Sequence, residues 1–213
     1  MKALIVAGGK PPSEELLRNA VDCGYDFIIA ADSGAKVLLQ YEIPFQLLVG
    51  DLDSLDDRSK EKIKESQEVI RLDCEKDFTD TEAAFHEAKK RGADEILILG
   101  ATGTRQDHFM ANLAVLKQAL TEGIKAVLED DHNVIFMTDR SLELEPREGW
   151  TPSFFPYGGD IQDFSLLNVK YPLAHHPLRG DSTRTVSNEF LQGPAKIKFS
   201  EGTVLVMLAR DHA

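Results

Sequence analysis

Short apolar runs alternate with amphipathic stretches along the first part of the chain. The runs lie at residues 2–7, 26–31, 46–49, 67–72, 95–99 and 124–128. Continuous apolar runs of this length are typical of strands that are buried on both faces. Because strand and helix patterns alternate, the sequence predicts a parallel sheet with helices on both faces, a Rossmann-like α/β domain over residues 1–130.

The stretches between the runs carry signals for helix starts and ends. Ser13 is a candidate N-cap. Thr79 and the glutamate three residues later have the spacing of a capping box. A further helix is expected near residues 56–65, with either Ser54 or Asp56 as its cap. Glycines stand where three of the helices should end, at Gly24, Gly92 and Gly123.

The pattern changes near residue 130, and the domain boundary is expected within residues 128–134. From Asn133 onward, short β-like runs are separated by turn signals, and the pattern predicts no helix. Evenly spaced short strands of this kind are typical of all-β domains. We therefore expect a smaller C-terminal β-sandwich domain over residues 131–213.

Composition narrows the class of ligand. A net charge of −12 and a pI near 4.9 argue against a nucleic-acid partner, which would need clustered Lys and Arg. Cys23 and Cys74 are too few for a disulfide framework and indicate thiols in a reducing compartment. No apolar run approaches the roughly 18 residues of a membrane span, and the start does not have a signal-peptide pattern. We expect a cytoplasmic protein with no membrane partner.

Three acidic clusters fall at or near the expected carboxyl edge of the sheet, where ligands bind in open α/β sheets. They contain Asp51 with Asp53, then Asp77 with Asp80, and finally Asp107. Mg²⁺ is usually held by one or two carboxylates together with substrate phosphates. The clusters therefore indicate a site for metal-bound polyphosphate.

Two of these clusters also have plainer interpretations. Residues two apart on an extended segment point the same way, so Asp51 and Asp53 are expected to face one metal ion. The alternative is a polar turn that leads into a helix. Asp80 stands in the first turn of an expected helix, where the helix dipole alone favours a carboxylate.

Groups that can bind phosphate are expected at two places. The helix that starts at Thr79 offers free backbone N–H groups. The loop over residues 100–105 contains two glycines, which allow backbone N–H groups to approach phosphate. Arg105 in this loop can bind phosphoryl oxygens through two parallel hydrogen bonds. His108 and Asn112 share one face of the helix that follows.

Two other segments allow more than one interpretation. Asp32-Ser33-Gly34 follows the second apolar run, where an acidic residue often meets a ribose or a metal, but it also has the form of an N-cap. Asp107 is either a helix cap or part of the pocket. Gly8 and Gly9 indicate only a flexible turn.

Taken in order, these segments resemble the motifs of the thiamine pyrophosphokinase family. The first four are Asp32-Ser33-Gly34, Gly50 to Ser54, Lys76 to Glu82, and Gly103 to His108 with Asn112 after it. The last two are Lys170 to Leu173 and Ser187 to Phe190. Each motif alone is modest, but six in order with this domain plan are specific. The resemblance covers nearly the whole chain.

The resemblance implies transfer of a pyrophosphoryl group from ATP to the hydroxyethyl oxygen of thiamine, giving thiamine diphosphate and AMP. It implies catalytic roles for Asp51, Asp53, Asp77 and Arg105, with the three aspartates holding Mg²⁺. The residues expected at the nucleotide are Asp32, Ser33, Gly34, Lys76, Thr79, Asp80, Asp107, His108 and Asn112. Those expected at thiamine are Ser187, Asn188 and Phe190. In the family, the thiamine site lies between the subunits of a homodimer.

Three positions depart from the family pattern. Thr104 replaces a glycine, so the backbone there is less free to adopt a positive φ. Leu52 replaces a common phenylalanine, and Asn168 stands where glycine is frequent. Two other functions stay open: a phosphatase resembling the haloacid dehalogenases, with an aspartyl-phosphate at Asp51, and a nucleotide-binding module without catalysis.

Overall fold

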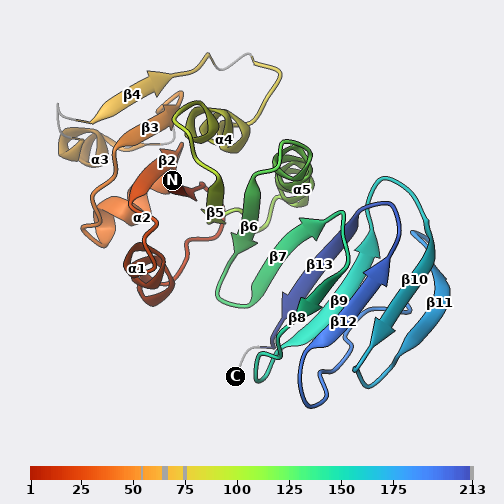
Figure 1. The fold of residues 1–213 in the computed structure, drawn as a ribbon. Coiled ribbons are helices and arrows are strands. Elements are labelled where there is room, and N and C mark those ends of the chain that lie inside the picture. Colours follow the sequence, from red (N-terminus) through yellow and green to blue (C-terminus); the bar gives the residue numbers. More distant parts are fainter. Residues whose placement is uncertain (54, 64–66, 74–75, 212–213) are drawn as a thin grey trace. The chain divides into compact units, whose positions relative to one another are not determined.

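The computed structural model describes residues 1–53, 55–63, 67–73 and 76–211. These residues form two compact units, Met1–Asp131 and His132–Ala213 (Figure 1). The first is a mixed α/β unit built on parallel strands, and the second consists of antiparallel strands. Within the described ranges, none of the helices has both the length and the apolar character needed to cross a membrane.

Six parallel strands form the sheet of the α/β unit. They are β1 Lys2–Val6, β2 Phe27–Ala31, β3 Leu47–Gly50, β4 Glu68–Arg71, β5 Glu95–Leu99 and β6 Lys125–Glu129. Each of the six expected apolar runs is therefore a strand. Their order is β4-β3-β2-β1-β5-β6, with every neighbouring pair parallel. Because β2 and β5 lie on opposite sides of β1, a topological switch point falls between β1 and β5.

Five helices lie in the described part of this unit. They are α1 Glu14–Asp22, α2 Gly34–Gln40, α3 Asp57–Lys62, α4 Asp80–Lys90 and α5 Gln106–Thr121. The expected caps of α1 and α4 are confirmed: Ser13 Oγ accepts from Leu16 N at 3.2 Å, and Thr79 Oγ1 accepts from the N–H of Glu82 at 3.1 Å. The Glu82 carboxylate accepts from Gln118 Nε2 at 2.7 Å and so ties α4 to α5.

The sequence left open which residue caps α3 and whether the segment before α2 is a helix cap. The structure decides both points. Asp56 caps α3, since its Oδ1 accepts from Ser59 N at 2.7 Å, whereas Ser54 lies outside the described residues. The start of α2 has no side-chain cap. The hydroxyl of Ser33, the residue before α2, donates to Gly8 O at 3.3 Å instead. This bond ties the segment after β2 to the turn after β1.

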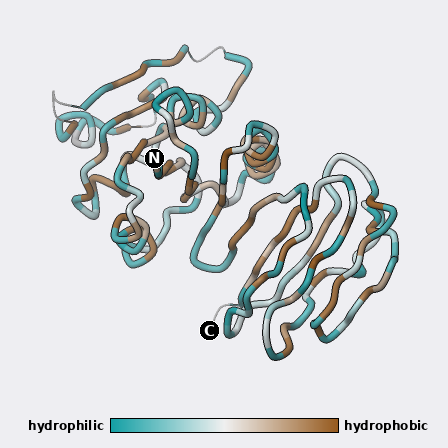
Figure 2. Tube along the Cα trace, viewed as in Figure 1, coloured by the Kyte–Doolittle hydropathy of each residue, from teal (hydrophilic) through white to brown (hydrophobic). Residues whose placement is uncertain are grey.

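The α/β unit is held by apolar contacts between strands and helices. Leu4, Val6 and Ile28 belong to one cluster of buried side chains with residues of α1 and α2. Helix α4 packs against β1, β2 and β3, and α5 packs against β6. Figure 2 shows hydrophobic residues concentrated along the strands and hydrophilic residues along the connections. Strand ends and their loops are thus where polar side chains can gather.

The described residues of the second unit form strands and no helix, as expected from Asn133 onward. They are β7 Asn133–Thr138, β8 Leu142–Leu144, β9 Thr151–Pro156, β10 Ile161–Leu167, β11 Leu173–Leu178, β12 Ala195–Phe199 and β13 Val204–Ala209. Strand β13 pairs antiparallel with β7 and β9. A separate antiparallel sheet has the order β11-β10-β12-β8. Phe154, Phe164 and Val206 belong to one buried cluster that contains residues of both strand sets.

Candidate functional site

A cavity of about 1000 Å³ lies in the α/β unit, at the carboxyl ends of the central strands. Its wall includes residues 7–10 after β1, residues 100–105 after β5, and Asp32 after β2. Residues 78–81 at the start of α4 also line it. The cavity therefore occupies the crevice at the switch point between β1 and β5, where open α/β sheets bind their ligands.

Glycines let the two central loops approach each other closely. Gly9 N donates to Gly100 O at 2.7 Å. A Cβ placed on Gly9 would stand 2.1 Å from Thr102 O, closer than any side chain allows. Gly100 has a φ of +67° and lies against Ala7 O, so a side chain is excluded there by both conformation and space. The result is a wall of backbone without side chains, which lets a ligand approach the main chain closely.

The structure places part of the expected nucleotide set on this cavity. The predicted residues that line it are Asp32, Lys76, Thr79, Asp80, Arg105, His108 and Asn112. The predicted residues of this unit that do not line it are Ser33, Gly34, Asp51, Asp53, Asp77 and Asp107. Gly34 has a packing role, because a Cβ there would stand 1.9 Å from Val6 O.

Lys76 and Asp80 form an ion pair in the cavity wall. The Lys76 Nζ atom lies 3.1 Å from Asp80 Oδ1, and both side chains are mostly buried. Among the described residues, this buried oxygen accepts no hydrogen bond, so the contact is an ion pair without hydrogen-bond geometry. A carboxylate oxygen in this condition is suited to a further cationic partner.

Arg105 and Asp107 form a second pair at the start of α5. The Arg105 Nη2 and Nε atoms donate to Asp107 Oδ2 and Oδ1 at 2.6 and 2.9 Å. These hydrogen bonds hold the pKa of the Asp107 carboxyl well below its usual range and raise the pKa of Arg105. Asp107 does not cap α5, because it lies inside the first turn and Arg105 precedes the helix. Of the alternatives that the sequence left open for Asp107, the helix cap is therefore wrong.

Asn112 holds the loop after β5 in place. Its side chain is buried, and its Nδ2 donates to Ala101 O at 2.8 Å. His108, one turn earlier in α5, also lines the cavity but is exposed. The shared helix face predicted for these two residues is thus the face that borders the cavity.

The segment between Asp51 and Asp53 is a turn, so the expectation of an extended strand end was wrong here. Leu52 has a φ of +65°, in the left-handed region. Asp53 N donates to Asp51 Oδ1 at 3.0 Å, the local bond by which an aspartate stabilises a turn. In a turn, residues two apart do not point the same way as they do on a strand. The geometric argument for one metal ion facing both carboxylates therefore fails.

No group of three or more acidic, His or Cys side chains in the described ranges is arranged to hold a metal ion. Mg²⁺ needs fewer protein ligands than that, since it keeps several waters and is completed by substrate phosphates. Asp80 offers one oxygen to such a partial site, since its Oδ1 is buried in the cavity wall and accepts no hydrogen bond, with Lys76 Nζ 3.1 Å away as an ion-pair partner. Asp51 is close by in the fold, since Gly50 packs against Asp32 of the cavity wall.

In the second unit, Asn188 joins two segments of chain. It is 2% exposed, and its Oδ1 accepts from the backbone N–H groups of Tyr171 and Glu189 at 3.1 and 2.9 Å. Its Nδ2 donates to Tyr171 O at 2.9 Å. Ser187 is exposed, with a φ of +52°, and its N–H donates to Ser153 Oγ at 2.9 Å. Asn188 thus fixes the backbone that presents Ser187.

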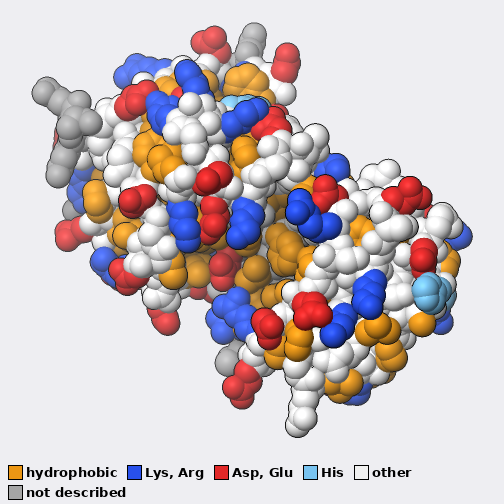
Figure 3. Space-filling view, in the orientation of Figure 1, with side chains coloured by type: hydrophobic (Ala, Val, Ile, Leu, Met, Phe, Trp, Pro, Cys, Tyr) orange, Lys and Arg blue, Asp and Glu red, His pale blue; other side chains and the backbone are white. Residues whose placement is uncertain are grey.

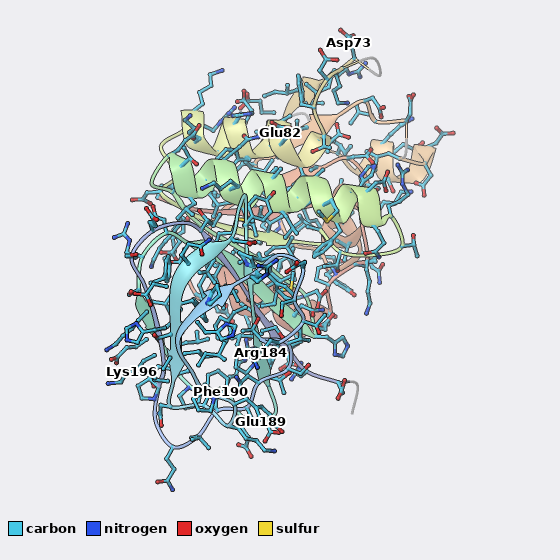
Figure 4. All side chains as sticks on the ribbon, turned by 90° about the vertical axis from the view of Figure 1, so that its right-hand side faces the viewer. Asp73, Glu82, Arg184, Glu189, Phe190 and Lys196 are labelled. Atoms are coloured by element: carbon cyan, nitrogen blue, oxygen red, sulfur yellow. The ribbon has the colours of Figure 1, made fainter. Side chains whose placement is uncertain are left out.

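Phe190 is half-buried beside this segment, where it forms a β-bridge with Val169 and packs against the apolar cluster of the second unit. Figure 4 labels Phe190 and its neighbour Glu189. The Glu189 carboxylate accepts from Lys170 Nζ at 2.6 Å. The two sequence segments expected from the family resemblance, Lys170 to Leu173 and Ser187 to Phe190, are therefore brought together.

The three departures from the family pattern differ in backbone conformation. The positive φ after β5 belongs to Gly100 and Gly103, whereas Thr104 has an ordinary φ. Asn168 adopts a φ of +57°, which asparagine tolerates better than most residues, and its Nδ2 donates to Pro194 O at 2.9 Å. In the turn from Asp51 to Asp53, Leu52 is the residue with a positive φ.

Sequence reasoning missed part of the cavity wall. Lys10 and Asp130 line it but belong to none of the expected site segments, whereas Phe78 and Thr102 lie in expected segments without having been assigned a role. Gly8 and Gly9 were interpreted as a flexible turn, but Gly9 is fixed against the loop after β5 and Gly8 lies against Ser33. The signal was a glycine pair followed by a lysine directly after the first strand, which is the position of phosphate-binding loops in α/β proteins.

A parallel sheet with a glycine-lined cavity at its switch point, followed by a unit of antiparallel strands, defines a two-unit protein with a site suited to a phosphorylated ligand. Two family models match this plan. "Thiamin pyrophosphokinase, catalytic domain" matches residues 22–128, and "Thiamin pyrophosphokinase, vitamin B1 binding domain" matches residues 139–204. The chain belongs to the thiamin pyrophosphokinase family.

Individual relatives agree with this assignment. A thiamine pyrophosphokinase from Bacillus subtilis (strain 168) is 30% identical over 97% of this chain and 98% of its own length. The crystal structure of thiamine pyrophosphokinase from Bacillus subtilis has a TM-score of 0.89, with 28% identity and complete coverage of both chains. The yeast thiamin pyrophosphokinase, at 16% identity, shares the fold with a TM-score of 0.81 over 98% of this chain and 86% of its own.

Proposed function

We propose that this protein is a thiamine pyrophosphokinase, which transfers the pyrophosphoryl group of ATP to the hydroxyethyl oxygen of thiamine and releases AMP. The observation that carries the proposal is the glycine-lined cavity at the switch point of a chain that belongs to this family. Transfer of this kind depends on positioning and charge neutralisation more than on covalent help from the protein. A backbone wall with lysine and arginine beside it meets those needs.

ATP binds in the cavity of the α/β unit, which we take to be a Rossmann-like domain. Thr79 and Asp80 at the start of α4 offer the phosphates a helix N-terminus. His108 borders the pocket directly, and Asn112 shapes it by holding the loop after β5. Ser33, Gly34 and Asp107 do not touch the nucleotide but support the residues that line the cavity. Asp32 is placed for the ribose or the metal.

Lys76 and Arg105 neutralise charge on the phosphates during transfer. Both are engaged before ATP arrives, Lys76 with Asp80 and Arg105 with Asp107. Each must therefore share or exchange a carboxylate partner when the nucleotide binds. Asp107 keeps the guanidinium of Arg105 oriented until that happens, since two parallel hydrogen bonds fix its plane.

We assign Mg²⁺ to Asp51, Asp53 and Asp77, with the phosphates of ATP as further ligands. When bound, the ion neutralises phosphate charge and orients the transferring group. The turn at Leu52 directs the two aspartates differently, so the assignment rests on their position after β3 and on the family motif. Asp53 or Asp77 is also the candidate for accepting the proton of the thiamine hydroxyl.

Thiamine binds to the second unit, which we take to be a β-sandwich. Ser187 is exposed and can hydrogen-bond the pyrimidine edge of the vitamin. Asn188 acts mainly by holding this segment, since most of its hydrogen-bonding capacity is used within the chain. Phe190 supplies apolar surface beside it. The match of residues 139–204 to a vitamin B1 binding domain supports this assignment.

The active unit is a homodimer with thiamine sites shared between subunits, and we place it in the cytoplasm. The family resemblance supports the dimer, and the distribution of the two residue groups over two units supports the shared site. A cytoplasmic location is supported by the presence of only two cysteines, Cys23 and Cys74.

Product analysis separates this function from its alternatives. With ATP and Mg²⁺, the proposed enzyme forms AMP and thiamine diphosphate only when thiamine is present. A phosphatase that forms an aspartyl-phosphate at Asp51 would release orthophosphate without thiamine, and a silent binding module would release neither. Thiamine-independent orthophosphate release would overturn the proposal.

A further inference from the structure

We propose that Lys10 binds the polyphosphate chain of the nucleotide and does so without giving up a carboxylate partner. The inference deepens the proposed function and rests on ATP being the ligand of this site. Lys10 stands directly after Gly8 and Gly9, is exposed, and lines the cavity. It belongs to none of the six motifs on which the family resemblance was based.

The backbone of Lys10 is fixed from two sides. Its N–H donates to Thr102 O at 2.6 Å, extending the pairing between β1 and β5 beyond the ends of both strands. A Cβ on Gly103 would stand 3.0 Å from the Lys10 nitrogen, and the φ of +144° at Gly103 is one that residues with side chains rarely adopt. The position from which the lysine side chain extends is thus set by the same contacts that form the cavity wall.

The residues after Lys10 restrict it further. Pro11 and Pro12 have their φ angles fixed by their rings, and Ser13 caps α1. An X–Pro sequence also confines the residue before it to extended conformations. The backbone at Lys10 therefore has little conformational freedom to lose when a ligand binds, and only the side chain has to be ordered.

Lys10 differs from the other cations of the cavity wall in how they pair with carboxylates. Lys76 is paired with Asp80, and Arg105 is paired with Asp107. Within the described part of the chain, Lys10 has no carboxylate within ion-pair distance and no hydrogen-bond acceptor for its ammonium group. Lys10 can therefore bind phosphate without giving up a partner, whereas Lys76 and Arg105 must rearrange.

The acidity of the whole chain gives a cation at the cavity a role in attracting the ligand. With a net charge of −12, the long-range field opposes the approach of a polyphosphate. On the face drawn in Figure 3, basic side chains lie scattered among acidic ones. A cation at the cavity, such as Lys10, offsets this opposition locally. A solvated lysine elsewhere on the surface would not have its backbone built into the wall of a cavity.

The test compares Lys10→Met with wild type by calorimetric titration of ATP, and separately of inorganic tripolyphosphate, at fixed excess Mg²⁺ and without thiamine. Met keeps the length of the side chain and removes the charge. Lys125→Met is the matched control, because Lys125 is 82% exposed and is the first residue of β6. It therefore lies at the amino ends of the strands, whereas the cavity lies at their carboxyl ends. Lys10→Arg tests whether charge alone restores binding.

We expect Lys10→Met to lower the affinity for ATP and for tripolyphosphate at least tenfold, or about 1.4 kcal/mol of binding free energy. Lys125→Met should stay within about twofold of wild type, Lys10→Arg should recover most of the affinity, and all variants should unfold at the wild-type temperature. Affinity of Lys10→Met within twofold of wild type, or an equal loss in Lys125→Met, would overturn the proposal. Wild type that binds ATP but forms no thiamine diphosphate would instead overturn the proposed function and leave the Lys10 comparison standing.

Discussion

Asn188 and Tyr171 exchange two hydrogen bonds, with Asn188 Oδ1 accepting from Tyr171 N at 3.1 Å and Asn188 Nδ2 donating to Tyr171 O at 2.9 Å. One buried amide side chain thus replaces the pairing that two adjacent strands would make. Tyr171 itself is 56% exposed, and its backbone rather than its ring is what Asn188 recognises. The bond pair makes the segment around Ser187 dependent on a residue that is nearly inaccessible to solvent.

We predict that Asn188→Ala lowers both the stability of the second unit and the use of thiamine. The substitution leaves the N–H and C=O of Tyr171 and the N–H of Glu189 without their partner, which should cost about 1–3 kcal/mol of unfolding free energy. The kcat/KM for thiamine should fall roughly tenfold or more, while calorimetric ATP affinity stays within a few-fold. Thermal unfolding and steady-state kinetics check the two effects.

Gln162→Ala, an exposed amide on β10, is the control for Asn188→Ala and should change neither quantity. Equal loss of ATP and thiamine affinity in Asn188→Ala would place Asn188 in the nucleotide site or in the fold at large. The assignment of Ser187 to Phe190 to thiamine would then be wrong.

We predict that Asp51→Asn nearly abolishes turnover without unfolding the protein. Asparagine keeps the Oδ1 acceptor that Asp53 N uses, so the turn should persist, but it removes the charge needed by the metal. Turnover should fall below about a tenth of wild type, roughly 1.4 kcal/mol of barrier. Asp26→Asn, before the amino end of β2, removes the same charge at the opposite sheet edge and should be neutral. A fully active Asp51→Asn enzyme would refute the metal assignment.

We predict that the Arg105–Asp107 pair contributes to stability at neutral pH and loses its contribution only in acid. Arg105 lowers the folded-state pKa of Asp107, so any stabilisation is present above the ordinary carboxyl pKa of about 3.9 and is lost as pH falls through the lowered value. The difference in unfolding temperature between wild type and Asp107→Asn should be constant between about pH 5 and 8. It should shrink below about pH 4.

Thermal unfolding of both proteins over a pH series tests this. A difference that grows as the pH falls would mean that Asp107 is not the group held ionised by Arg105. Because both side chains are mostly exposed, the constant difference should be small, as it is for other surface ion pairs.

The strands were predictable because parallel strands buried on both faces need continuous apolar runs. Leu47–Gly50 and Glu95–Leu99 have this pattern. Caps such as Ser13 were predictable because they depend on residues only three apart. The turn at Leu52 was not, since nothing in the side chain of leucine signals a positive φ. Its conformation depends on how the segment after β3 packs against β2.

Lys10 could not be placed from the sequence because its significance depends on sheet order. Its contact, Thr102, follows β5, and the two loops meet only because β1 and β5 are neighbours. Likewise, the burial of Asn188 depends on a pairing with a segment 17 residues away. Motifs indicated which segments carry chemistry. Which residues face a ligand and which hold those residues in place depends on long-range contacts that the sequence does not show.

We predict that the active unit is a dimer whose sites each combine the α/β unit of one chain with the β unit of the other. Asp51→Asn chains and Asn188→Ala chains are mixed in equal amounts and allowed to exchange subunits, after circular dichroism has shown that each is folded. If sites are shared, every mixed dimer has one site with both defects and one site with neither. Half of the dimers are mixed under random exchange, so activity should rise towards about a quarter of wild type. If each site were built within one chain, every site would keep one defect and mixing would restore nothing. A monomer by light scattering at the assay concentration, or no recovery after verified exchange, would therefore refute the shared site, while the acidic turn at Asp51 and the cavity beside it would keep their proposed chemistry.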